Sequence, residues 1–122
     1  MGIQETLGIE IIEVKKGYAA LKLEITEKVL QPFGYLHGGV SVLLAEHAAS
    51  LGASHSIATD EIAFGLEINA NHLASKQSGE IVAVANCVHD GKTTQVWQID
   101  LIDEGGRKIC VSRATLAVKK KH

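Results

Sequence analysis

One long stretch of the chain is almost free of charge. From Val29 to Thr59 the only Asp, Glu, Lys or Arg is Glu46. The only proline, Pro32, marks a loop near its start, and a His-Gly-Gly turn at residues 37–39 leads into a run of apolar and small residues. A helix drawn from about Gly38 to about Ile57 is apolar around most of its circumference, which is typical of a buried helix. The rest of the chain is therefore expected to enclose this helix.

Segments with the two-residue alternation of half-buried strands lie on both sides of the helix. Apolar residues at 21, 23 and 25 alternate with Lys22 and Glu24, and the same pattern recurs around Trp97. The Asp90-Gly91 pair is a strong hairpin signal. The predicted strands are Ile9–Val14, Tyr18–Ile25, Phe64–Leu73, Glu80–His89, Thr93–Asp103 and Lys108–Val118, and a short helical turn is predicted at Gln4–Leu7.

This order of elements predicts an α+β fold in a single domain, 1–122, because 122 residues are enough for one domain and few for two. One antiparallel sheet wrapped around one long central helix buries both. The last four strands follow each other through short links, so we expect them to form an antiparallel meander. Open sheet edges invite pairing with another chain, which favours an oligomer.

Composition narrows the class of partners. The net charge is −2, with 12 basic and 14 acidic residues, so no overall field attracts nucleic acid. No secretory signal and no apolar run of ~18 residues is visible, so no membrane partner is expected. The two cysteines, Cys87 and Cys110, lack C-x-x-C spacing. They could face each other from two strands, but two buried thiols in a reducing compartment are favoured, which predicts a cytoplasmic protein.

Glu46 is the first candidate for chemistry. A carboxylate in an apolar helix is costly to bury unless it is paired, and a site can exploit its chemistry. An ionised Glu46 can take a proton from water or attack a carbonyl. Ser50, four residues on, lies on the same helix face and can hold a water or orient the carboxylate. From composition alone, a structural Glu46 that hydrogen-bonds a neighbouring strand remains the simpler interpretation.

The turn His37-Gly38-Gly39 is the second candidate, because the first N–H groups of a helix are unpaired and carry the positive end of its dipole. Glycines let a ligand approach the backbone, so such a turn can hold an oxyanion or a thioester carbonyl. For the tripeptide alone, an ordinary helix start that uses glycine for geometry is the simpler interpretation. Gln31 can donate its amide to a substrate carbonyl, although a loop glutamine facing water is simpler.

No metal site or cofactor site is predicted. Glu46 and His47 have the order Glu-His rather than H-E-x-x-H, and the histidines show no ligand spacing. The chain has no G-x-G-x-x-G and no P-loop motif. The predicted chemistry therefore uses no metal and no cofactor.

Taken together, these residues are more specific than any one of them. Gln31-Pro-Phe-Gly-x-Leu-His-Gly-Gly, followed by Glu46 seven residues after Gly39, resembles the hotdog-fold acyl-CoA thioesterases, and most closely their PaaI-like branch. That branch includes thioesterases acting on 4-hydroxybenzoyl-CoA and 1,4-dihydroxy-2-naphthoyl-CoA. The likeness continues through residues 65–72, 95–99 and 112–115. It implies a hotdog fold and hydrolysis of an aromatic or medium-chain acyl-CoA to free acid and CoA.

The resemblance also implies roles for individual residues. Glu46 matches the family's nucleophile or general base, and Gly38 matches the residue whose N–H polarises the thioester carbonyl. Gln31 and His37 match side chains that orient substrate and water, and Ser50 matches the polar residue one turn after the carboxylate. Substrate contacts, mainly with the nucleotide and pantetheine of CoA, are implied for Gly39, His89, Gly91, Lys92, Ser112 and Arg113.

Two other functions stay open. The same fold can serve as a non-catalytic module that binds an acyl-CoA or an aromatic ligand. A hotdog dehydratase acting on acyl-carrier protein needs a His and acid pair as proton shuttles, and the His-Gly-Gly and Glu46 pattern fits thioester hydrolysis better.

The spacing of Gly38 and Glu46 favours a site shared between two chains. Along one helix they are ~11 Å apart, so they cannot meet on one carbonyl carbon. We expect a homodimer in which two antiparallel copies of the helix pack through the small residues Ala48, Ala49 and Gly52. The family that the chain resembles forms such dimers, often paired into tetramers.

Overall fold

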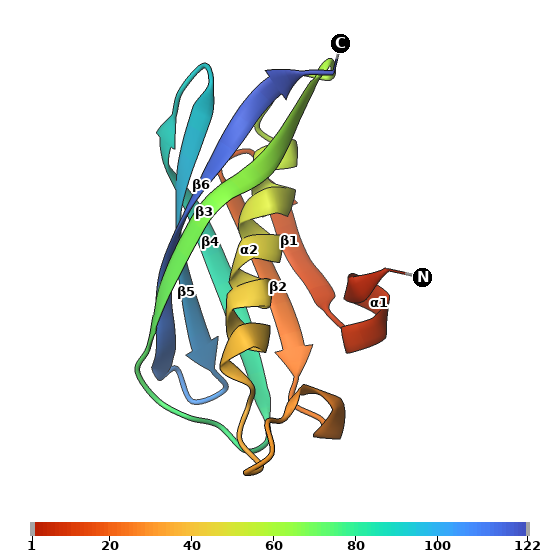
Figure 1. The fold of residues 1–122 in the computed structure, drawn as a ribbon, viewed down its shortest axis with the longest axis vertical. Coiled ribbons are helices and arrows are strands. Elements are labelled where there is room, and N and C mark those ends of the chain that lie inside the picture. Colours follow the sequence, from red (N-terminus) through yellow and green to blue (C-terminus); the bar gives the residue numbers. More distant parts are fainter. Residues whose placement is uncertain (1, 122) are drawn as a thin grey trace.

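The computed structural model describes residues 2–121 and contains one long helix held by one sheet (Figure 1). The elements, in chain order, are α1 Ile3–Leu7, β1 Glu10–Lys15, β2 Tyr18–Glu24, a 3₁₀ turn Glu27–Val29, α2 Gly38–Ser54, β3 Glu61–His72, β4 Glu80–Asp90, β5 Thr94–Asp103 and β6 Lys108–Lys120. The predicted α+β architecture, with a sheet wrapped around a central helix, is confirmed.

The sheet has six strands in the order β1-β2-β4-β5-β6-β3, and all its pairs are antiparallel. β4, β5 and β6 form the expected meander, but β3 does not pair with β4. It pairs with β6 at the far edge, and the link from β3 to β4 passes below the start of α2, so the prediction of a four-stranded meander is wrong for β3. This arrangement places strands on both flanks of α2.

Helix α2 ends at Ser54 rather than near Ile57. The side chains of Ser54, His55 and Ser56 bond the carbonyls of residues 50, 51 and 52 in the preceding turn. Short polar side chains compete in this way with continued helix for backbone partners. The Ser56 hydroxyl also accepts the Gly17 N–H at 2.8 Å, which ties the end of α2 to the β1–β2 turn.

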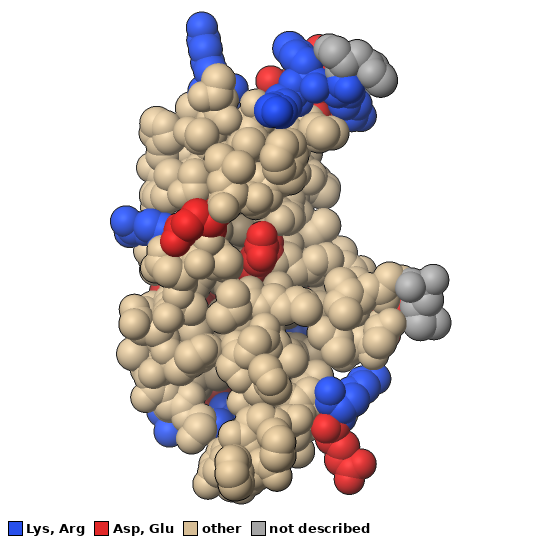
Figure 2. Space-filling model, in the orientation of Figure 1, with Lys and Arg blue, Asp and Glu red and all other residues tan. Residues whose placement is uncertain are grey.

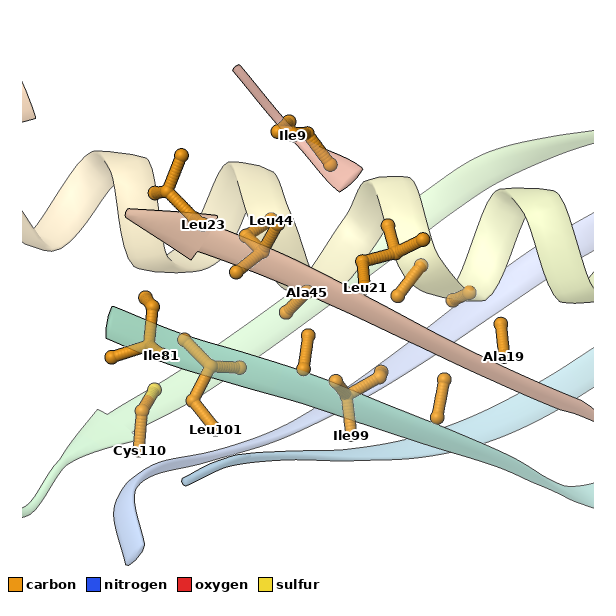
Figure 3. Packing of buried hydrophobic residues seen from close by; sticks show 14 of the residues in the cluster. Ile9, Ala19, Leu21, Leu23, Leu44, Ala45, Ile81, Ile99, Leu101 and Cys110 are labelled. Atoms are coloured by element: carbon orange, nitrogen blue, oxygen red, sulfur yellow. The ribbon is translucent and has the colours of Figure 1, made fainter. Parts of the chain in front are cut away.

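The core lies between one face of α2 and the concave face of the sheet (Figure 3). The helix contributes mainly alanine to this contact, and the strands contribute larger side chains, among them Leu21, Ile81, Ile99 and Leu101. Ala48 and Ala49 are fully buried, and Gly52 lies beneath the Trp97 ring. The small face of α2 is therefore occupied by its own sheet, and the prediction that Ala48, Ala49 and Gly52 pack against a second helix is wrong.

The edge strand β3 carries unpaired backbone and exposed apolar side chains. Ile62, Phe64 and Leu66 on β3 and Leu73 just after it are exposed by 41–58%. In the view of Figure 2, the face formed by α2 and β3 is mostly uncharged, and Lys and Arg gather toward its ends. An apolar, unpaired edge of this kind is a surface for pairing with another chain.

Both cysteines are free thiols. Cys110 is buried as expected, whereas Cys87 is only half-buried, and burial raises the pKa of each thiol. No helix among residues 2–121 is both long enough and apolar enough to cross a bilayer.

The contact between Gly52 and Trp97 yields a prediction about stability. Gly52→Ala favours helix by ~1 kcal/mol, yet the added Cβ would overlap the indole, with only 2.6 Å to Cζ3. We expect the free energy of unfolding, measured in urea, to fall by about 1–3 kcal/mol because of this overpacking. The same change in a Trp97→Leu background should cost less, and an equal cost in both backgrounds would contradict the role of the indole.

Candidate active site

His37 shapes the start of α2. Its ring Nδ1 accepts the Gly39 N–H at 2.9 Å, and its backbone N–H donates to the Val29 carbonyl at 2.9 Å. An acceptor Nδ1 selects the neutral tautomer with the proton on Nε2, so the outer ring nitrogen is a donor. The Gly38 N–H makes no hydrogen bond to another residue of 2–121. The helix therefore begins with an unpaired N–H group at Gly38, as expected from the sequence.

The two glycines at this point have imidazole rings close to the positions that a Cβ would take. A Cβ on Gly38 would lie 3.1 Å from His72 Nε2, and a Cβ on Gly39 would lie 3.0 Å from the His37 ring. His72 was not predicted as a site residue. The two-residue alternation of β3 places it on the same face as Ile68 and Ala70, and that pattern was the available signal.

Gln31 is held by its own loop. Its Oε1 accepts the backbone N–H groups of Phe33 at 2.6 Å and Tyr35 at 3.3 Å. The carbonyl end is thus occupied, and the side-chain NH₂ bonds no other residue in the described part of the chain. Gln31, Gly38 and His72 line one pocket of about 280 Å³. This pocket presents donors, which suits a carbonyl oxygen.

Glu46 and Ser50 line a second pocket, of about 450 Å³, together with Gly39 and His47. No residue of 2–121 donates a hydrogen bond to the half-buried Glu46 carboxylate, so a structural Glu46 bonded to a neighbouring strand is not observed. His47 Nε2 lies 2.8 Å from Gln4 Oε1. Burial lowers the pKa of the His47 imidazole, and the negative charge of Glu5 partly offsets this by raising it. His47 is therefore used to hold α1.

The chain matches a known protein family over most of its length. The family model described as the thioesterase superfamily matches residues 33–110. The chain belongs to the thioesterase superfamily. It is 67% identical to a 1,4-dihydroxy-2-naphthoyl-CoA hydrolase of Listeria monocytogenes, over 99% of this chain and 98% of that protein.

Two further relatives agree. A 1,4-dihydroxy-2-naphthoyl-CoA hydrolase of Escherichia coli is 43% identical over 79% of this chain and 71% of its own. A crystal structure of a thioesterase from Haemophilus influenzae superposes with a TM-score of 0.93 at 42% identity, covering 97% of this chain and 82% of that one. The hotdog fold is thereby confirmed, and the chain is a thioester hydrolase rather than a non-catalytic module.

Of the residues predicted to contact the substrate, Gly39 lines the Glu46 pocket, whereas the other five do not gather around Gly38 or Glu46 in this thioesterase. His89, Gly91 and Lys92 lie at the β4–β5 hairpin, at the end of the molecule opposite the start of α2 (Figure 1). Ser112 and Arg113 point to opposite faces of β6. The Ser112 hydroxyl is buried without a partner among the described residues, and Arg113 donates to Gln98 Oε1 at 3.1 Å. These contacts stay predictions.

Metal ligands do not gather in the described part of the thioesterase: no group of three His, Cys, Asp or Glu among residues 2–121 has a metal-binding arrangement.

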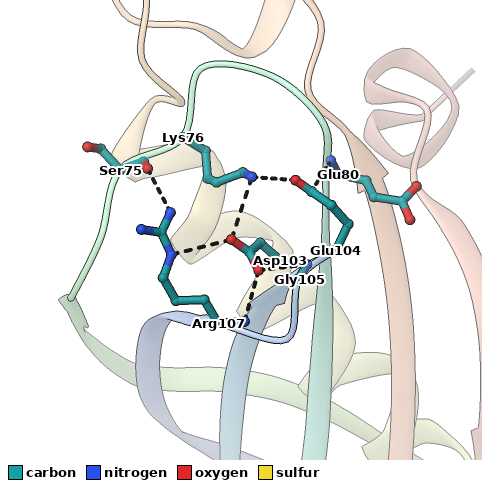
Figure 4. Close-up of polar contacts among 7 residues, drawn as sticks. All are labelled: Ser75, Lys76, Glu80, Asp103, Glu104, Gly105 and Arg107. Atoms are coloured by element: carbon teal, nitrogen blue, oxygen red, sulfur yellow. Dashed lines mark hydrogen bonds and ion pairs between the residues drawn. The ribbon is translucent and has the colours of Figure 1, made fainter.

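A network of charges supports the pocket beneath Gly38 (Figure 4). Lys76 Nζ contacts Glu104 and lies 3.6 Å from Asp103 Oδ2, which Arg107 Nε also approaches at 3.3 Å. The Lys76 carbonyl accepts the Leu36 N–H at 2.7 Å, one residue before the cap of α2. The network therefore fixes the loop that carries His37 to the β5–β6 turn.

Hydrogen bonds set the charge state of this network. The Arg107 backbone N–H lowers the pKa of Asp103, and the bond from Lys76 lowers the pKa of Glu104. The bond to Glu104 raises the pKa of Lys76. Because their pKa values are lowered, the two carboxylates stabilise the fold above the usual carboxyl pKa of ~4, and this stabilisation is lost as the pH falls further. The stabilisation from the raised pKa of Lys76 is lost only as the pH rises above ~10.4.

Lys76→Met is expected to lower the free energy of unfolding most at neutral pH and progressively less as the pH falls below ~4, since the carboxylates then lose their charge in either protein. Urea unfolding at pH 7 and pH 3 measures the difference. Lys22→Met, which breaks the more exposed pairs with Glu10 and Glu80, serves as the control and should cost less. A cost of Lys76→Met that is independent of pH would contradict a charge-based role.

Proposed function

We propose that this thioesterase hydrolyses an aromatic acyl-CoA, with Glu46 as nucleophile or general base and the Gly38 N–H as the group that polarises the thioester carbonyl. The main support is that the Glu46 carboxylate and the Gly38 N–H each lie in a pocket and that neither makes a hydrogen bond within residues 2–121. The Listeria relative, at 67% identity, supports 1,4-dihydroxy-2-naphthoyl-CoA as the first substrate to test.

The reaction begins with the carbonyl oxygen of the thioester at the start of α2. The unpaired Gly38 N–H and the positive end of the helix dipole stabilise the charge that develops on this oxygen. The Gln31 NH₂ and the His37 Nε2–H are further donors that orient the substrate and the attacking water. Because α2 supplies this charge from fixed backbone groups, little reorganisation accompanies the reaction.

Glu46 then acts on the acyl carbon. It either attacks directly, giving a mixed anhydride that water opens, or it removes a proton from the attacking water. In both routes the carbon–sulfur bond breaks and CoA leaves as a thiolate. Ser50, one turn on in the same pocket, orients the carboxylate or holds the water.

Two chains are needed to assemble this site. Gly38 and Glu46 lie about 11 Å apart along α2 and line different pockets, so one carbonyl cannot meet both in one protomer. Antiparallel pairing of β3 with its copy would cover Ile62, Phe64 and Leu66 and set Glu46 of one chain near Gly38 of the other. This homodimer uses the free edge of the sheet, and pairing of two dimers gives a tetramer.

The remaining assignments concern CoA and location. Gly39 lies beside the thioester, and Lys92 and Arg113 supply positive charge for the phosphates of CoA, with His89, Gly91 and Ser112 near the nucleotide and pantetheine. Two free thiols fit a reducing compartment, so we place the protein in the cytoplasm.

Glu46→Gln tests the assigned role. The change keeps the size of the side chain and removes its basicity, so turnover of 1,4-dihydroxy-2-naphthoyl-CoA should fall by ~10²–10⁴ in a thiol-release assay. The melting temperature should be kept. Glu24→Gln on β2 is the matched control and should leave turnover unchanged. Thiol release by Glu46→Gln near the wild-type rate would overturn the catalytic assignment.

Mixing two inactive variants tests the shared site. Glu46→Gln and His37→Ala each damage every site of their own homodimer. In a mixed dimer one site receives both changes and the other receives neither, so roughly a quarter of wild-type activity should return after random exchange. Exchange is followed independently by native mass spectrometry. Mixed dimers without activity would show that each site is built by one chain.

A further inference from the structure

Gly65 on β3 lies directly against Glu46. A Cβ at residue 65 would overlap Glu46 Oε2 and would lie 3.3 Å from its Cδ. The carboxylate thus occupies the space that any other side chain at this position would fill.

The backbone does not require glycine at this position. Gly65 is not among the glycines with a positive φ, and its conformation in β3 is open to other residues. Glycine in a strand is unfavourable because it loses more conformational freedom on folding and has no side chain to pack. The free space above residue 65 is the feature that the structure uses.

A bulge in β3 sets this glycine in place. Gly65 pairs with Leu116 and Glu67 with Thr115, so Leu66 is the extra residue. Ile68 and Ala70 point toward α2, and unbroken alternation would turn Leu66 and Phe64 toward it as well. One extra residue shifts the alternation, so that Gly65 faces α2 and Leu66 is left 58% exposed. Without the bulge, a leucine would stand where the carboxylate lies.

We propose that Gly65, presented by this bulge, is the seat of the Glu46 carboxylate and a positioning residue for thioester hydrolysis. The inference rests on the proposed role of Glu46. A side chain at residue 65 forces the carboxylate away from β3, the strand that also carries His72 beside Gly38. Displacement of a reacting group by about 1 Å can cost ~10²-fold in rate.

Gly65→Ala is the test. We expect kcat for thiol release to fall by ~10–10²-fold while KM changes less than about threefold, because the base moves and the binding surface does not. Circular dichroism and the melting temperature check the fold. Glu67→Ala is the control on the same strand and should keep the wild-type kcat, since Glu67 is exposed on the face of β3 opposite Gly65 and its side chain bonds only Asn69 among the described residues. A Gly65→Ala enzyme with wild-type kcat overturns the proposal.

A double-mutant cycle separates positioning from a general effect on β3. Asp at residue 46 is one methylene shorter and leaves room for the new Cβ. Gly65→Ala should therefore cost at least about fivefold less in kcat in a Glu46→Asp background than in the wild type. Equal costs in the two backgrounds would mean that the alanine acts through the strand and not through the carboxylate, which overturns the seat.

The Glu46→Gln variant distinguishes the two proposals. If it turns over substrate normally, both the role of Glu46 and its seat are wrong. If it is inactive while Gly65→Ala keeps full kcat, the proposed function stands and only the seat is wrong.

Discussion

Helix α2 approaches the sheet through alanine and glycine, and this close contact governs the rest of the molecule. Ala45, Ala48 and Ala49 have no exposed surface, and the indole of Trp97 fills the space above Gly52. Small residues on the helix let large strand residues reach its backbone, which gives dense packing with an almost wholly aliphatic core. Because this face is filled, only the opposite face of α2 can carry chemistry.

The positions of the polar residues of the candidate site follow from this packing of α2. Glu46 and Ser50 lie outside the alanine face of α2 and line a pocket, with the Glu46 carboxylate against the edge strand β3. The N–H of Gly38 is unpaired among residues 2–121 and lies at the start of the helix. The half-buried Glu46 carboxylate thereby avoids the cost of deep burial. Strand β3 contacts both functional points of the helix, at Gly38 through His72 and at Glu46 through Gly65.

Strand β3, which contacts α2 beside Gly38 and Glu46, is also an edge strand whose outer side is unpaired. Assembly through β3 would fix the positions of His72 and Gly65 relative to α2 more firmly than one chain can. In the proposed homodimer, assembly and the geometry of the site are thus connected through one element.

Local patterns predicted most elements, and tertiary contacts decided what they missed. Alternation found the strands, and the charge-free run found α2. The end of α2 was placed beyond Ser54 because apolar Ile57 extends the pattern, whereas serine side chains end the helix. The partner of β3 was missed because a short link to β4 does not determine which strands pair.

The same limit applies to the site. The candidates Glu46, Gly38 and Gln31 come from a linear motif, which a sequence displays directly. The small face of α2 was assigned to a second helix because alanine and glycine permit approach of either a helix or a sheet. His72 and Gly65 escaped notice because their importance lies in what stands opposite them, and nothing in a strand pattern specifies that distance.

The pocket that holds Glu46 has one wall from outside the core. Ile3 of α1 lines it, and α1 is tied to α2 by the bond between Gln4 and His47. None of the residues of α1 is fully buried, and Leu7 at its end packs against the core, whereas Ile3 at its start is exposed. Changes at Ile3 can therefore reshape the pocket without disturbing the sheet or Glu46. The fold thus separates the part of the sequence under selection for stability from a part free to diverge, and new acyl preferences can evolve there by few substitutions.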